Sequence, residues 1–204
     1  VHWSVLGYLL VLGSQSFPDA GPVREYRCRS TAQKIVVDGR LDELAWKEAA
    51  FSGPLVDIVD GSPALFDTRV ALLWNREYLY VAYSLEEPDV KADLTVRDSF
   101  IWQENDVEFF FAGEDAYYEL ELNARNTVYE VFWIWKDALV PGSAYFGRPE
   151  FDPGSQRVMN LAGVGGHLHP RGERWGFLDW DLPGLLTAVH PEGTLNDSSD
   201  RDRG

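Results

Sequence analysis

Three consecutive segments in which residues alternate between two faces constrain the fold of this chain most strongly. They cover residues 106–112, 117–123 and 127–135, and each has the length and period of an ordinary β-strand. Residues 113–116, with the sequence GEDA, connect the first two segments. Only antiparallel strands can be joined by so short a connection. The pattern therefore predicts an antiparallel sheet in this part of the chain.

Further strands are predicted on both sides of these segments. Residues 67–74 and 78–85 are rich in β-forming residues and flank Asn75-Arg76-Glu77, which suits a short hairpin loop. A short strand is predicted at 34–39, and another is expected to begin within 183–190.

Two other segments have different patterns. Residues 41–50 have the apolar spacing of a short helix. The segment 137–184 is rich in Gly and Pro and is interpreted as a long loop. Taken together, these patterns predict an all-β protein, an antiparallel β-sandwich of jelly-roll-like type with one short helix near the N-terminus.

Composition and charge exclude several classes of function. The chain of 204 residues is 45% hydrophobic and can form one domain with a substantial core. Its formal net charge of −15 would repel phosphate groups, so neither nucleic acid nor an anionic membrane surface is expected as a partner. A single cysteine, Cys28, excludes an internal disulfide framework.

The N-terminal region predicts export. Residues 1–16 contain an apolar run from Val5 to Leu12 followed by small residues, a pattern typical of a secretory signal peptide and too short to span a bilayer. A buried first strand is the alternative interpretation of this run. Residues 17–33 are interpreted as a linker and residues 34–204 as the folded domain. The expected location is secreted, periplasmic or extracellular, with membrane contact only during export.

A set of polar residues and one tryptophan forms the candidate functional site. Asp106 and Glu108 share one face of the first strand, and Trp102 precedes it. If strands 106–112 and 117–123 pair through the tight turn, their polar faces coincide. An indole plane beside fixed carboxylates and amides suits a sugar, whose apolar ring face stacks on an aromatic group while its hydroxyls bind oxygens. The alternative is an ordinary solvated face of a sheet. The candidate carbohydrate-binding residues are Trp102, Glu108, Glu119, Glu121 and Asn123.

Five motifs, in this order and spacing, resemble the family 9 carbohydrate-binding modules. The motifs are DGRLDELAW (38–46), LLWNREYLYVAYSLEEPDV (72–90), IWQENDVEFFF (101–111), YYELELNARNTV (117–128) and WDLPGLLTAV (180–189). The resemblance implies a β-sandwich that binds mono- or oligosaccharides or the ends of polysaccharide chains without catalysis. It also implies an accessory role in carbohydrate catabolism, often beside a glycoside hydrolase, and structural calcium in some members.

The resemblance also implies roles for individual residues. By motif alignment, Trp102 matches the first of two tryptophans that clamp the sugar, Glu108 a glutamate that binds a hydroxyl, and Asn123 an asparagine in the next strand. Glu121 stands where characterised members carry an arginine. The second clamp tryptophan belongs to C-terminal strands of the family that this chain is expected to lack.

Two functions from other classes remain as alternatives. Glu119 and Glu121 are two residues apart, so their carboxyl groups could approach the separation that inverting glycosidases use. Met159, His167 and His169 could contribute axial ligands in a haem-binding redox sandwich. Calcium is the most plausible metal because oxygen ligands are abundant, but the sequence assigns no calcium ligands.

Overall fold

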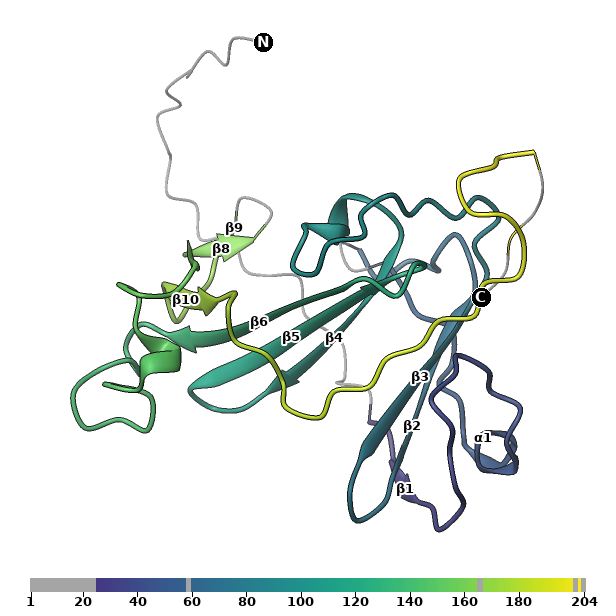
Figure 1. Ribbon diagram of the computed structural model, residues 1–204, viewed down its shortest axis with the longest axis horizontal. Helices are drawn as coiled ribbons and strands as arrows, with labels where there is room; N and C mark the ends of the chain where they lie inside the picture. The colour runs from purple at the N-terminus through teal and green to yellow at the C-terminus, as the bar shows by residue number, and fades with distance from the viewer. Residues whose placement is uncertain (1–24, 58–59, 165–166, 200–201, 203–204) are drawn as a thin grey trace, which may run out of the picture.

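The protein is a β-sandwich built from two main sheets (Figure 1). This computed structural model describes residues 25–57, 60–164, 167–199 and 202, so the predicted signal-like segment 1–16 and most of the predicted linker lie outside the described residues. The prediction of an all-β antiparallel sandwich with one short helix is confirmed. That helix is α1 (Leu44–Glu48), and two short 3-10 helices, η1 (Ile101–Gln103) and η2 (Pro149–Phe151), lie in connections.

The smaller main sheet has the strand order β1-β2-β3. Strands β2 (Thr68–Trp74) and β3 (Leu79–Leu85) form the predicted hairpin. The two-residue strand β1 (Arg29–Ser30) pairs in parallel with the end of β2, so this part of the predicted linker belongs to the sheet.

The larger sheet has the strand order β4-β5-β6-β10-β7. Strands β4 (Asp106–Ala112), β5 (Ala116–Asn123) and β6 (Val128–Trp135) coincide closely with the three alternating segments of the sequence. Strands β7 (Val158–Leu161) and β10 (Arg174–Phe177) come from the segment interpreted as a loop. A separate ribbon joins β8 (Gly163–Val164) to β9 (His167–Leu168).

Two predicted strands are absent. Residues 34–39 form no strand, because their polar contacts are local, such as the bond from the Val36 amide to the Glu43 carboxylate at 2.9 Å. Residues 183–190 also form no strand. They run between the two sheets, where the Thr187 carbonyl accepts a bond from Asn126 and Val189 contacts Gly39. Gly39 has a φ of 82°, and a side chain there would meet the backbone of Val189 at 2.5 Å.

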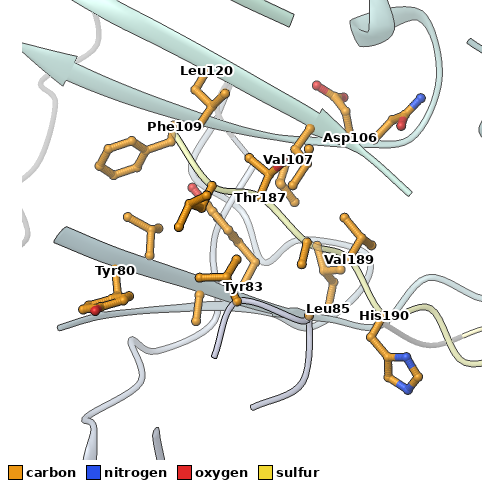
Figure 2. Close-up of a pocket in the computed structure, with 18 of the residues that line it drawn as sticks. Tyr80, Tyr83, Leu85, Asp106, Val107, Phe109, Leu120, Thr187, Val189 and His190 are labelled. Atoms are coloured by element: carbon orange, nitrogen blue, oxygen red, sulfur yellow. The ribbon is translucent and has the colours of Figure 1, made fainter. Parts of the chain in front are cut away.

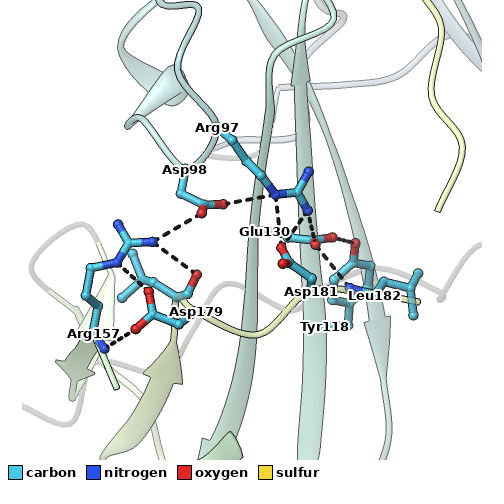
Figure 3. Close-up of polar contacts among 9 residues, drawn as sticks. Arg97, Asp98, Tyr118, Glu130, Arg157, Asp179, Asp181 and Leu182 are labelled. Carbon is cyan, nitrogen blue, oxygen red and sulfur yellow. Dashed lines mark hydrogen bonds and ion pairs between the residues drawn. The ribbon is translucent and has the colours of Figure 1, made fainter. Parts of the chain in front are cut away.

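A buried carboxylate fixes the segment that leads out of β10. Glu130, in the centre of β6, is fully buried and accepts bonds from Arg97 and from the Tyr118 hydroxyl. The Leu182 amide donates a third bond at 3.1 Å. Figure 3 shows the arginine reaching both Glu130 and Asp181, with a second arginine, Arg157, joining neighbouring aspartates. The network ties the chain after β10 to the inner face of the large sheet.

We expect Arg97→Ala to destabilise the protein by roughly 1–3 kcal/mol, because it leaves the buried Glu130 charge without its cationic partner. Chemical denaturation measures the change. Arg69→Ala is the matched control, since Arg69 pairs with Asp67 where both side chains are exposed. Equal stability of the two variants would contradict the role given to this network.

Candidate functional site

The outer face of the large sheet, the face turned away from the small sheet, gathers the predicted polar residues. In the β4–β5 ladder Glu108 lies opposite Glu121, Asp106 opposite Asn123, and Phe110 opposite Glu119. Directly opposed residues of an antiparallel pair point to the same side of the sheet. The four carboxylates of this ladder therefore lie on one face, as the pairing through the tight turn predicted.

Trp102 lies on the same face. Its ring packs against Tyr129 with 5.3 Å between centroids and against Phe100 with 4.4 Å. Tyr129 is the β6 partner of Glu121 in the ladder, so the indole stands beside the carboxylate row. Its exposed fraction of 43% leaves part of the ring open to solvent. The structure thus brings together Trp102, Glu108, Glu119 and Glu121.

The two glutamates of β5 are held in a partly desolvated arrangement. The Trp133 indole N–H donates to Glu119 at 2.5 Å, and Glu121 is the next residue of β5 on the same face of the sheet. Glu121 is only 2% exposed, and its Oε2 atom has no hydrogen-bond partner. The carboxyl group of Glu121 is thereby buried, whereas that of Glu108, its partner in the ladder, stays exposed.

Burial and mutual repulsion raise the pKa values of this row. Desolvation, followed by the charges of Asp106, Glu119 and Glu108, raises the pKa of Glu121 to about 9. Desolvation and the neighbouring carboxylates raise the pKa of Asp106 to about 7. The pKa of Glu119 is also raised, first by desolvation. Near neutral pH Glu121 therefore carries a proton and can donate a hydrogen bond as well as accept one.

Asn123 is buried and holds two neighbouring segments of the chain in place. It is 1% exposed, and its amide nitrogen donates to the Leu94 carbonyl and to Glu104. Its side-chain oxygen accepts the backbone amides of Arg125 and Thr127. The oxygen end of the amide thus holds the connection between β5 and β6, and the nitrogen end holds the segment before β4. The role of Asn123 in sugar binding stays a prediction.

The structure adds residues that the sequence analysis did not assign to this face. Arg174 of β10 is 6% exposed and lies over the rings of Tyr117, Trp133 and Trp135 at 5.3–5.8 Å. Its Nε donates to the Tyr117 hydroxyl at 2.6 Å, and its Nη1 has no hydrogen-bond partner. The alternation of the four residues RWGF is the feature of the sequence that indicates strand β10 and places Arg174 on this face. So short an alternation does not stand out in a Gly-rich segment.

Gly176 is required for this aromatic layer. It pairs with Trp133 across the β6–β10 ladder, and a Cβ at this position would lie 2.7 Å from the indole ring. The absence of a side chain lets Trp133 lie flat and reach Glu119.

A large cavity of about 1230 Å³ lies on the other face, between the two sheets. Figure 2 shows Val107 and Phe109 of β4 facing Tyr80 and Leu85 of β3 across it, with the chain from Thr187 to His190 alongside. Asp106 and Asn123 are among the residues that line it. The lining is otherwise mainly aliphatic and aromatic, which suits contact between apolar sheet faces rather than recognition of sugar hydroxyls. Trp102 and the three glutamates of the candidate site do not line the cavity.

The residues considered for haem ligation have other contacts. His169 packs against Trp135 in a tilted arrangement with 4.4 Å between ring centroids, and its Nδ1 accepts a hydrogen bond from the Arg171 amide at 3.1 Å. Met159 packs against the buried cluster that includes Tyr129 and Trp133. The side chain of His167 lies outside the described residues.

The chain was compared with known proteins. No family model matches it, and no curated protein or solved structure shows significant similarity to it. Within the described residues, no helix is long and apolar enough to cross a membrane. The function is therefore inferred from the geometry of the site and from the motifs of the sequence.

We expect the free energy of unfolding to fall as the pH rises from about 5 to 9. A chelator is present in this measurement, so that no bound metal ion alters the titration of the carboxyl groups. The folded-state pKa of Glu121, about 9, lies above the value of about 4.3 for an unfolded glutamate. The stabilisation is therefore complete below the unfolded pKa and is lost as the pH rises through the folded pKa, by at most about 1.4 kcal/mol per pH unit for one proton. Asp106 acts in the same direction up to about pH 7.

Melting temperatures of the wild type and of Glu121→Gln across this pH range measure the effect. The variant should be the more stable protein at pH 9 and should depend less on pH. Glu77→Gln, at an exposed position in the β2–β3 loop, should behave like the wild type. A Glu121→Gln profile as steep as that of the wild type would contradict the assignment.

Proposed function

We propose that the chain is a non-catalytic carbohydrate-binding module that holds a pyranose on the outer face of β4 and β5. The observation that carries the proposal is the position of a half-exposed indole, Trp102, beside a row of ordered carboxyl groups on one side of the sheet. An aromatic plane binds the C–H face of the sugar ring, and neighbouring oxygens bind the hydroxyls. The proposed family is that of the family 9 modules, which the five sequence motifs resemble.

Each polar residue has a distinct part in this proposal. Glu108 is exposed and accepts bonds from hydroxyl groups. Glu121 carries a proton near neutral pH and donates a hydrogen bond to a sugar hydroxyl. Glu119 is held in place by its hydrogen bond from Trp133. A neutral acid beside ionised carboxylates supplies both a donor and acceptors, which a ring of hydroxyls requires.

The buried Arg174 supports the same proposal. Its Nη1 atom has no hydrogen-bond partner, and its positive charge partly opposes the desolvation that raises the pKa of Glu119. The resembled family carries an arginine at the position of Glu121. In this chain a guanidinium reaches the same face from β10 and is an additional donor to sugar hydroxyls.

The geometry disfavours the glycosidase alternative. Glu119 and Glu121 lie two residues apart on one strand, and desolvation is the first cause that raises the pKa of each. Glycosidase chemistry needs two carboxyl groups whose environments push their pKa values apart, and these two groups share one environment. We therefore propose binding without turnover, in a secreted protein that takes part in carbohydrate catabolism.

Calorimetric titration with xylose, glucose and cellobiose, followed by a glycan array, tests the proposal. We expect Trp102→Ala to weaken binding by about tenfold or more, because the stacking plane is lost. Trp74→Ala is the matched control, since Trp74 has a similar exposed fraction, 47% against 43%, but lies on the small sheet. Equal loss in both variants, or no binding to any pyranose on the array, would contradict the proposal, and release of reducing ends would contradict binding without turnover.

A further inference from the structure

The acidic face contains a compact group of oxygens with no cationic partner. One carboxylate oxygen from each of Asp106, Glu108 and Glu121 lies within 4.8 Å of the other two. Among the described residues, none of these three side chains forms an ion pair with Lys, Arg or His. The charged groups that act on Asp106 and Glu121 are all carboxylates, and they include Glu104 and Glu119.

The burial of Glu121 distinguishes this group from an ordinary solvated acidic patch. Its side chain is 2% exposed, and its Oε2 atom has no hydrogen-bond partner. The Oδ2 atom of Asp106 is likewise buried without a partner. Buried polar atoms are normally satisfied, and leaving a carboxylate oxygen unpaired costs free energy. Asp106 and Glu121 thus each have a buried oxygen without a partner, on strands that are paired in fixed register.

We propose that Asp106, Glu108 and Glu121 bind one divalent cation of the calcium type on the outer face of β4 and β5. Calcium binds oxygen ligands at 2.3–2.6 Å, so oxygens on opposite sides of one ion are up to about 5 Å apart. The three carboxylates fit within that span without a change of backbone. Magnesium holds its ligands at about 2.0–2.1 Å in a strict octahedron and fits a tighter cluster.

The strands give this site a defined floor and an open side. Asp106 and Glu121, which each have an oxygen without a partner, form the less exposed part of the site, and Glu108, which lies opposite Glu121 in the ladder, supplies an exposed ligand. An ion bound to all three keeps coordination positions for water on the side of Glu108. The site shares Glu108 and Glu121 with the proposed sugar site, and calcium binding displaces the proton that Glu121 carries near neutral pH in the absence of the ion. The calcium site depends only on the three carboxylates and is tested without sugar.

Calcium binding by the whole chain, stripped with a chelator and then freed of it, is the direct test. We expect calorimetric titration at pH 7.5 to show one ion bound per chain, and calcium to raise the melting temperature. Asp106→Asn and Glu121→Gln keep the shape of the side chains and should each weaken calcium binding by about tenfold or more, as the loss of a metal ligand does. Terbium luminescence excited through tryptophan gives a second measure of the same site.

Glu77→Gln is the control, because it removes one negative charge from an exposed loop of the small sheet and should bind calcium like the wild type. Circular dichroism verifies that all variants are folded. Absence of calcium binding by the wild type at concentrations up to about 10 mM would overturn the proposal. Calcium binding that is equal in the wild type and in both cluster variants would also overturn it.

Discussion

The pairing of β4 with β5 is the constraint on which the rest of the structure depends. A tight connection sets the register, and that register places Glu108 opposite Glu121 and Asp106 opposite Asn123. Because side chains alternate, a shift of one residue would send these carboxylates into the apolar space between the sheets and bring Val107 and Phe109 to the outside. The register of the β4–β5 pair therefore determines both the apolar inner face and the acidic outer face.

The outer face concentrates charge at a cost in stability. Glu121 is almost fully buried, and its carboxylate neighbours repel it. Glu130 on the inner face differs from Glu121: it is equally buried, but it accepts hydrogen bonds from Arg97, Tyr118 and Leu182. A buried acid with three partners ties segments together, whereas a buried acid with a free oxygen is prepared for a ligand. This difference is the physical basis for placing the site on the outer face.

The sequence predicted those parts of the fold that have a strong period. Strand β4 has the predicted bounds, since alternation and a short turn left little freedom. Trp133 and Trp135 are buried, as apolar strand runs indicate, but Trp74 is 47% exposed because it ends β2 beside the hairpin loop. Strand β10 was missed because an alternation of only four residues does not stand out in a Gly-rich segment. The apolar residues at 183–190 were predicted to form a strand, yet they run between the sheets without joining a ladder.

The candidate site was predictable in outline only. Alternation placed Glu119 and Glu121 on one face. It could not show that the Asn123 amide bonds the backbone of Leu94 and Thr127. Nor could it show that Arg174 of the distant strand β10 lies over Trp133. The central claim is that the outer face of β4 and β5 binds sugar. Its most direct test follows the eight tryptophan indole N–H signals by NMR during a titration with the best-binding sugar. The account predicts that the signals of Trp102 and Trp133 move while that of Trp74 stays fixed, and a sugar that moved Trp74 and left those two unchanged would contradict it.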